Sequence, residues 1–370
     1  MKLLDQAIPI PAHRPYPTNS WMPPAGVRII SSDDHNMEVD HLFEDRLPAK
    51  FKHKAPEIYI EGDELVFEAE GRSLIPKGVD IDVQIGLPGY CDLDTKIKHM
   101  DAENISSALI FHGMFQALNG LKDRELYWAC VDVYNEWLVE YLEPHADRMK
   151  GVAILPAFLK PEAAHDYMQK LVGLGYTAVQ MPHSPKGIRW NSKELFPVWR
   201  AIAESGIPLS FHAGAYAVFQ GNGAIGANLT ANLCPYRNLF GAMLFSGAFD
   251  QAPDLKVVFH EGGGAWVAQM LNDIDYIAAT FGTQLKPKLE LRRPSDYWRR
   301  HGHVSFMVDP VALQLVDQIG EDSLIWCSDY PHPEGTFGFT GELLKESYET
   351  LGPVAGAKFL GGNAARLWGL

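Results

Sequence analysis

The chain has 370 residues, of which 46% are hydrophobic and 21% are charged, and its formal net charge at pH 7 is −14 with a pI of about 5.4. This length suits a barrel with insertions, and the composition is that of a globular protein. An acidic surplus of this size excludes nucleic acid and anionic membranes as partners, because both would be repelled. We therefore expect a small-molecule substrate.

The chain shows no sign of a membrane segment or of disulfide bonds. Its N-terminus lacks the long apolar stretch of a signal peptide, and no run of about 18 uncharged apolar residues predicts a membrane span. The cysteines, at positions 91, 130, 234 and 327, are scattered without the paired spacing of a metal site. A reduced, cytoplasmic protein is expected.

The first quarter of the chain is irregular. Residues 1–26 are rich in proline, which predicts an extended arm lying on the body of the protein or on a neighbouring subunit. The apolar run 27–30 leads into a cluster of acids and a histidine, so a strand is predicted to end there. Residues 39–95 are expected to form an insertion over the mouth of the fold, with a hairpin between runs 57–60 and 65–67.

From residue 108 onwards, short apolar runs alternate with amphipathic patterns. Strands are predicted at 108–111, 151–155, 177–181, 208–211, 255–259, 304–308 and 324–327, and helices at 124–142, 161–172, 192–205, 239–249, 265–281, 310–319, 341–351 and 353–368. With the first run this gives eight strands, and the alternation favours a single α/β domain at 27–370, a (β/α)8 barrel of TIM type. An open doubly wound sheet is the alternative, but no glycine-rich nucleotide turn follows the first strand.

Polar residues gather where the predicted strands end, at the rim that carries active sites in such barrels. They are Asp33 and His35, His112, His183, His212, His260 with Glu261, and Asp329 with His332. Imidazoles and carboxylates that meet at one mouth are ligands for zinc, manganese or iron. Asp33 and His35 alternate along a strand, so both can reach one ion. The run Gly262–Gly264 would let the backbone turn so that the adjacent His260 and Glu261 both point inward.

Four of these segments resemble the amidohydrolase-related family, the branch of the amidohydrolase superfamily that includes aminocarboxymuconate-semialdehyde decarboxylase. They are Asp33-Asp-His35, Phe211-His-Ala-Gly214, Gly262-Gly-Gly-Ala-Trp266 and Ser328-Asp-Tyr-Pro-His332, and the resemblance covers roughly residues 27–368. It implies one divalent ion held by Asp33, His35, His212 and Asp329. Zinc is the first expectation, manganese and iron are the alternatives, and a second ion is allowed for.

Hydrolysis is the first activity expected. Decarboxylating relatives in this family place a histidine directly before the glycine run, where this chain has Glu261. The ion would activate a water molecule, and Asp329 would accept the proton of that water and pass it to the leaving group. His260 or His183 would stabilise the developing oxyanion. Glu261, His112 and His332 are assigned to a second ion or to the substrate.

Three alternatives remain open. The same ion and Asp329 could support nonoxidative decarboxylation of an aromatic or unsaturated acid, two irons could activate oxygen, or the barrel could bind without catalysing a reaction. An apolar or aromatic substrate body is suggested by Trp190, Phe219, Trp266 and Phe337, although core packing suits Trp266. A homo-oligomer, in the form of a dimer, is also expected.

Overall fold

The computed structural model describes residues 16–17, 20–39, 41–61, 64–75, 87–156, 159–182, 189–212, 221–232 and 235–370. His183, Phe219 and most of the predicted arm lie outside these ranges. Across the described ranges, none of the helices combines the length and the hydropathy that crossing a bilayer requires.

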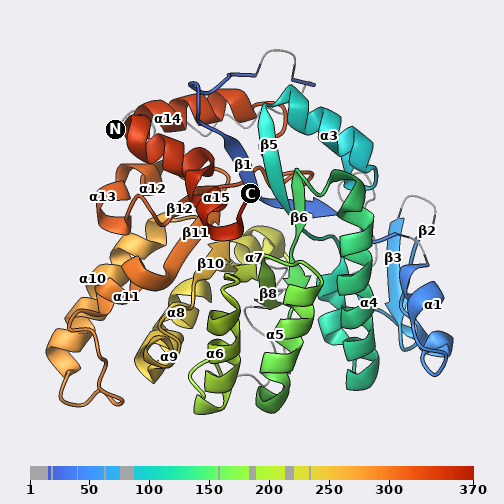
Figure 1. The fold of residues 1–370 in the computed structure, drawn as a ribbon, viewed down its shortest axis with the longest axis horizontal. Helices are drawn as coiled ribbons and strands as arrows, with labels where there is room; N and C mark the ends of the chain where they lie inside the picture. Colours follow the sequence, from blue (N-terminus) through green and yellow to red (C-terminus); the bar gives the residue numbers. More distant parts are fainter. Residues whose placement is uncertain are drawn as a thin grey trace.

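Eight parallel strand positions form the centre of the molecule, surrounded by helices (Figure 1). The strands are β1 (Ile29–Asn36), β5 (Ile105–His112), β6 (Met149–Gly151), β7 (Ala153–Ile154), β8 (Val179–Pro182), β9 (Leu209–His212), β10 (Val257–His260), β11 (Gly302–Phe306) and β12 (Leu324–Trp326). β6 and β7 are separated only by Val152 and together occupy one of the eight positions. All eight predicted apolar runs therefore contain a strand, and the expected (β/α)8 barrel is confirmed.

Hydrogen bonds join the strands in the order β1-β5-β6 and β7-β8-β9-β10-β11-β12. Val152 lies between β6 and β7 and connects the two groups, because its N–H donates to Ile110 O at 2.9 Å. On the other side, the segment after β12 pairs with β1. The Asp329 N–H donates to Asp33 O at 2.9 Å, and the His35 N–H donates to Tyr330 O at 2.7 Å.

The interior at the amino ends of the strands is filled by apolar side chains beneath the helix α15 (Asn363–Trp368). The cluster contains Ile30, Leu109, Phe111, Val152, Ala178, Val258, Ile325, Ala364 and Trp368. Such a filled interior leaves the polar residues at the opposite, carboxyl ends of the strands as the accessible part of the barrel.

Most of the outer helices lie where periodicity predicts them. The outer helices are α3 (Leu93–Ala102), α4 (Arg124–Leu142), α5 (Ala164–Gly173), α6 (Phe196–Ser205), α7 (Ala224–Asn232), α8 (Pro235–Ser246), α9 (Ala248–Gln251), α10 (Ala265–Phe281), α11 (Pro294–His301), α12 (Pro310–Gln314), α13 (Val316–Ile319) and α14 (Thr340–Ala357). Of these, α3, α7 and α11 were not predicted. Helix α4 begins at Arg124 because the Asp123 carboxylate accepts from the Glu125 and Leu126 N–H groups. Helix α14 is broken at Gly352, where φ is 74°, between the two helices predicted there.

The first strand is longer than predicted. The run 27–30 predicts a strand that stops before the acids, whereas β1 continues through Asn36 and includes Asp33 and His35. Every residue of β1 is buried. The polar residues extend the strand because the backbone of β5 and of the segment after β12 supplies hydrogen bonds on both sides.

The insertion contains the predicted hairpin, formed by the antiparallel strands β2 (Glu57–Glu61) and β3 (Glu64–Ala69) with the short β4 (Arg72–Ser73). It lies beside α4 at the edge of the barrel in Figure 1, together with the helix α1 (Leu42–Arg46). Arg46 Nη1 is 2.7 Å from Glu140 Oε2, and Lys50 Nζ is 3.2 Å from Glu125 Oε2. Helix α3, in the same region, was not predicted.

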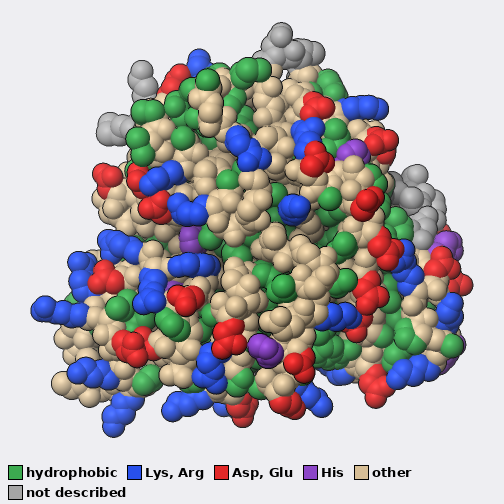
Figure 2. Space-filling view, viewed as in Figure 1, with side chains coloured by type: hydrophobic (Ala, Val, Ile, Leu, Met, Phe, Trp, Pro, Cys, Tyr) green, Lys and Arg blue, Asp and Glu red, His purple; other side chains and the backbone are tan. Residues whose placement is uncertain are grey.

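On the face seen in Figure 2, acidic and basic side chains are interspersed. No single-sign stripe of the kind that tracks a nucleic-acid backbone is seen on that face. Together with the net charge of −14, this fits the expected small-molecule substrate.

Candidate metal centre

Strand β1 supplies two neighbouring side chains to the mouth of the barrel. Asp33 and His35 are buried, and Asp33 Oδ1 lies 3.5 Å from His35 Nε2. The other ring nitrogen, His35 Nδ1, lies 2.7 Å from the backbone oxygen of His112, which orients the ring. Asp34, which lies between Asp33 and His35 in the sequence, faces the other side of the strand, where its carboxylate accepts a hydrogen bond from Ser31 Oγ at 2.6 Å.

Two further histidines come from β9 and β10 at the same height, since His212 and His260 are paired in register. His212 Nε2 is 3.2 Å from both carboxylate oxygens of Asp33. His260 Nδ1 is 3.3 Å from Asp33 Oδ2, and its Nε2 is 3.0 Å from Ser210 Oγ. The parallel register therefore places both imidazoles against the same carboxylate.

Glu261 points into the same space as its neighbour His260. Its φ of 58° lies in the left-handed region, which few residues other than glycine adopt, and this turns the side chain inward. Glu261 Oε1 is 3.6 Å from His212 Nε2 and 3.8 Å from His35 Nε2. The next residue, Gly262, has to be glycine, because a Cβ at that position would lie 2.4 Å from the Tyr236 ring.

The loop after β12 adds Asp329 and His332. Asp329 also has a left-handed backbone, with φ of 56°, and its Oδ1 lies 3.3 Å from His35 Nε2. Both carboxylate oxygens are buried without a partner in hydrogen-bond geometry among the described residues. The His332 ring centroid is 4.4 Å from that of His35. Backbone strain of this kind, seen at both Glu261 and Asp329, is typical of functional sites.

Burial and crowding shift the pKa values of these groups in opposite directions. Burial raises the pKa of Asp329, and the negative charges of Glu261 and Asp33 hold it well above its usual range. Burial also opposes the ionisation of Asp33, but the adjacent His212 and His260 lower its pKa below its usual range. For His35, burial lowers the pKa, but contact with Glu261 and the charge of Asp33 outweigh it and raise the pKa to about 9.

These residues fit a divalent cation. Asp33, His35, His212 and Glu261 each place one ligand atom within 4.8 Å of the others, and a second, overlapping group contains His35, Glu261, Asp329 and His332. Asp33 Oδ2, His35 Nε2 and both oxygens of Asp329 are buried polar atoms without a hydrogen-bond partner among the described residues. Since buried polar atoms in folded proteins are nearly always paired, a cation explains them and would also relieve the repulsion between the acids.

The remaining predicted site residues lie at different distances from this centre. His112 ends β5 and faces a pocket that borders His212, with ring centroids 6.4 Å apart. Burial lowers the pKa of His112 to about 3, so its ring is neutral. His183 lies outside the described residues.

The aromatic residues expected near the substrate pack elsewhere. The Trp190 ring lies 5.5 Å from that of Phe211, and Trp266 packs 5.7 Å from Phe259. Phe337 is buried beside His99, with ring centroids 4.6 Å apart. None of these three lines the pocket beside His212, so an aromatic substrate body near them stays a prediction, while Trp266 packs in the core as expected. Their ring contacts hold the core and the loop after β12 instead.

Two residues near the centre were missed. Gln180 lines the pocket from the strand β8, where a polar residue in an apolar run was an available signal. Lys96 is fully buried, and its Nζ donates to the backbone oxygen of His35 at 2.9 Å. No sequence signal separates Lys96 from an exposed lysine, because only the tertiary packing of α3 buries it.

Comparisons with known proteins agree with this geometry. The sequence model of the amidohydrolase family matches residues 79–370, which include β5 to β12 but not β1. A 2-amino-3-carboxymuconate-6-semialdehyde decarboxylase from Dictyostelium discoideum is 23% identical over 295 residues, covering 75% of this chain and 77% of that protein.

Two solved structures share the fold. An amidohydrolase from Mycobacterium avium subsp. paratuberculosis has a TM-score of 0.72 at 20% identity, covering 93% of this chain and 99% of that chain. A 5-carboxyvanillate decarboxylase from Novosphingobium aromaticivorans, solved with bound manganese, has a TM-score of 0.69 at 16% identity, covering 95% of this chain and 99% of that chain. The resemblance stated from the motifs is confirmed, and this chain belongs to the amidohydrolase family.

Proposed function

We propose that this protein is a metal-dependent nonoxidative decarboxylase of an aromatic or unsaturated carboxylic acid. Two of the similar proteins named by their activity are decarboxylases, one of which contains manganese. This reverses the order expected from the sequence, in which hydrolysis came first, and manganese replaces zinc as the first candidate metal. The homodimer expected from the sequence stays a prediction.

The observation that carries the proposal is the state of Asp329. Its carboxyl group is buried with Oδ1 3.3 Å from His35 Nε2, and burial, together with the negative charges of Glu261 and Asp33, raises its pKa well above the usual range and so favours its protonated form. A neutral carboxylic acid in a buried site is suited to general acid catalysis. Its backbone N–H, bonded to Asp33 O, fixes its position beside the candidate ligands.

In this mechanism Asp33, His35, His212 and Glu261 would hold the ion, with Asp329 at its side. When bound there, a divalent ion polarises the carboxylate and a neighbouring oxygen of the substrate. Asp329 delivers its proton to the carbon that bears the carboxylate. The bond between that carbon and the carboxylate then breaks, carbon dioxide leaves, and the electron pair restores the unsaturated system. Asp329 regains a proton from water.

Hydrolysis remains the second candidate because of Glu261. This carboxylate adds negative charge beside His35 and His212, which disfavours an anionic substrate relative to a neutral one. In a hydrolytic reaction Asp329 would act in its ionised form, as the base that accepts the proton of water. The two activities differ in whether oxygen from water enters the product.

The test uses the full chain loaded with manganese and a panel of hydroxybenzoates and unsaturated dicarboxylates. We expect carbon dioxide release without incorporation of oxygen from labelled water. Asp329→Asn should lower turnover by a factor of about 10² to 10⁴, because it removes a general acid while keeping the shape of the side chain. Asp317→Asn, the same change at an exposed acid of α13, is the matched control.

Full turnover in Asp329→Asn with unchanged metal content would exclude Asp329 as the proton donor. Incorporation of labelled oxygen into the product would select hydrolysis instead. Elemental analysis of the purified protein would separate manganese, zinc and iron, and redox-active iron would revive oxygen chemistry.

A further inference from the structure

A pocket adjoins the candidate metal centre and shares His212 with it. It lies between the segment after β5, the strand β8 and the end of β9. Its lining consists of His112, Phe115, Gln116, Asn119, Tyr127, Ile154, Gln180, Met181, Pro182 and His212. A small substituent of a ligand held at the metal centre would therefore reach this pocket.

Two polar side chains of the lining hold buried atoms that no described residue satisfies. They are Gln180 Oε1 and His112 Nδ1, and each residue is only 6% exposed. Two nearby side-chain amides, in contrast, have hydrogen-bond partners. Asn119 Oδ1 accepts from Tyr127 Oη at 2.9 Å, and the amide of Asn135 exchanges two hydrogen bonds with the backbone of Ile154. Buried polar atoms without partners are rare, so this pair indicates a ligand.

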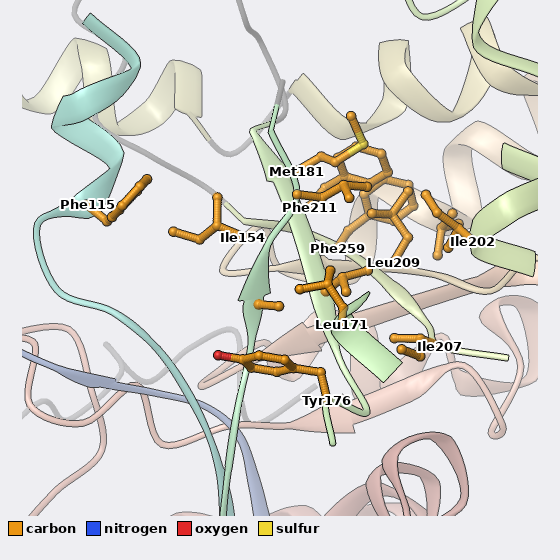
Figure 3. Packing of buried hydrophobic residues seen from close by; sticks show 14 of the residues in the cluster. Phe115, Ile154, Leu171, Tyr176, Met181, Ile202, Ile207, Leu209, Phe211 and Phe259 are labelled. Carbon is orange, nitrogen blue, oxygen red and sulfur yellow. The ribbon is translucent and has the colours of Figure 1, made fainter. Parts of the chain in front are cut away.

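The rest of the lining defines the part of the ligand that fits. Phe115, Ile154 and Met181 are buried apolar side chains from η3 (Phe115–Gly120), β7 and β8, and Figure 3 shows all three among the packed hydrophobic residues. The lining contains no Asp, Glu, Lys or Arg side chain among the described residues. A carboxylate would find no countercharge here, whereas the metal centre would supply one. The pocket thus suits a small, uncharged polar substituent.

We propose that Gln180 and His112 bind a hydroxyl or amino substituent of the substrate on the side away from its carboxylate, and so select which acids this protein accepts. The proposal rests on the proposed function for the placement of the carboxylate. A hydroxyl group can donate to Gln180 Oε1 and, through its own oxygen or through a second donor, pair with His112 Nδ1. An acid without that substituent would leave both atoms unsatisfied, which is a strong basis for discrimination.

The experiment measures binding rather than turnover. Isothermal titration calorimetry on the manganese-loaded full chain would compare benzoate with 3-hydroxybenzoate, 4-hydroxybenzoate and 3-aminobenzoate. We expect at least one substituted acid to bind about tenfold more tightly than benzoate, the scale of one well-placed hydrogen bond to a buried group. Gln180→Met, which keeps the length of the side chain, should abolish this preference.

Met181→Leu changes the same lining without altering its polarity, so it should keep the preference. His112→Phe provides a second test should Gln180→Met fold poorly, because the backbone oxygen that orients His35 is retained. Equal affinities in the unmodified protein, a preference that survives in both variants, or no binding by any of the acids would overturn the inference. Selective binding without carbon dioxide release would refute the proposed function alone.

Discussion

Lys96 shows how a single residue behind the centre can organise it. Its Nζ donates to His35 O, lies 3.9 Å from Asp34 Oδ2 and is 4.5 Å from the centroid of the Tyr330 ring. Burial lowers the pKa of Lys96 to about 8, while the charges of Asp34 and Asp329 oppose this change. One cation thus connects β1 to the loop after β12, which are far apart in the sequence.

We predict that Lys96→Met lowers the free energy of unfolding by about 3 kcal/mol, because it leaves a buried carboxylate and a carbonyl without their partner. Urea unfolding followed by circular dichroism measures the change. Lys98→Met, at an exposed position of the same helix, is the control and should stay within about 0.5 kcal/mol of the unmodified protein. Equal midpoints for both variants would contradict a stabilising role for Lys96.

Residue types and family motifs were enough to indicate the candidate centre but not its supports. Histidine and aspartate at strand ends form a pattern that differs from a random surface, so Asp33, His35, His212 and Asp329 could be singled out. Glu261 was also found, but the left-handed backbone that aims it inward depends on the space that Gly262 leaves for Tyr236. That contact joins distant segments and has no local signature.

Among the elements, the loop after β12 depends most on close packing. Gly335 ends a tight turn, and a Cβ on it would lie 2.6 Å from Asp329 O, 2.8 Å from Ser328 O and 3.0 Å from His332 O. The backbone of Gly335 therefore lies directly against the segment that carries the candidate acid. Only glycine fits at this position, because a Cβ would overlap these three backbone oxygens.

We predict that Gly335→Ala displaces Asp329 and His332, lowering the free energy of unfolding by about 1 to 3 kcal/mol. Manganese affinity should fall about tenfold or more, since support of the ligands is lost. Calorimetric titration and urea unfolding give the two quantities. Gly173→Ala in α5, where a Cβ meets nothing within 4 Å, is the control and should leave manganese affinity unchanged. Unchanged affinity in Gly335→Ala would argue against the loop as a support of the centre.

Elements with a clear apolar period were predictable. Helices α4 and α10 have the bounds predicted from their amphipathic patterns, and all eight strands coincide with apolar runs. The polar half of β1 has no such period, because its hydrogen bonds rather than its side chains keep it in the sheet. Helix α3 lies mostly between the predicted insertion at 39–95 and the strand predicted at 108–111, and its buried face includes the polar residues Lys96 and His99, so no apolar period predicted it.

At the scale of the whole molecule, the barrel gathers histidines and acids into one coupled cluster. Burial lowers the pKa of His212, but the charges of Asp33 and Glu261 raise it to about 9, the value also reached by His35. Both lie above the value of about 6.5 in an unfolded chain. In the metal-free protein these histidines therefore contribute stability that is complete below about pH 6.5 and is lost as the pH rises towards 9.

Since a metal ligand must lose its proton, manganese binding should become tighter over the same interval, from about pH 6.5 to 9. At pH 7 we expect about two protons to be released per ion, one each from His35 and His212. Calorimetry in buffers with different ionisation enthalpies measures this number. His53→Gln, at an exposed position of η1 (Lys52–Lys54), should release the same number. Binding without proton release would show that the cluster is not the metal site.

The sequence by itself determined the alternation of strands and helices, the residue types at the strand ends and the family, because these depend on local periodicity and on motifs within single segments. Only the tertiary structure decided how Glu261 and Asp329 face His35, how Lys96 is buried behind them, and which side chains line the pocket beside His212. Each of these depends on atoms from segments tens to hundreds of residues apart. Their distances, and the pKa shifts that follow from them, exist only once the barrel has brought those segments together.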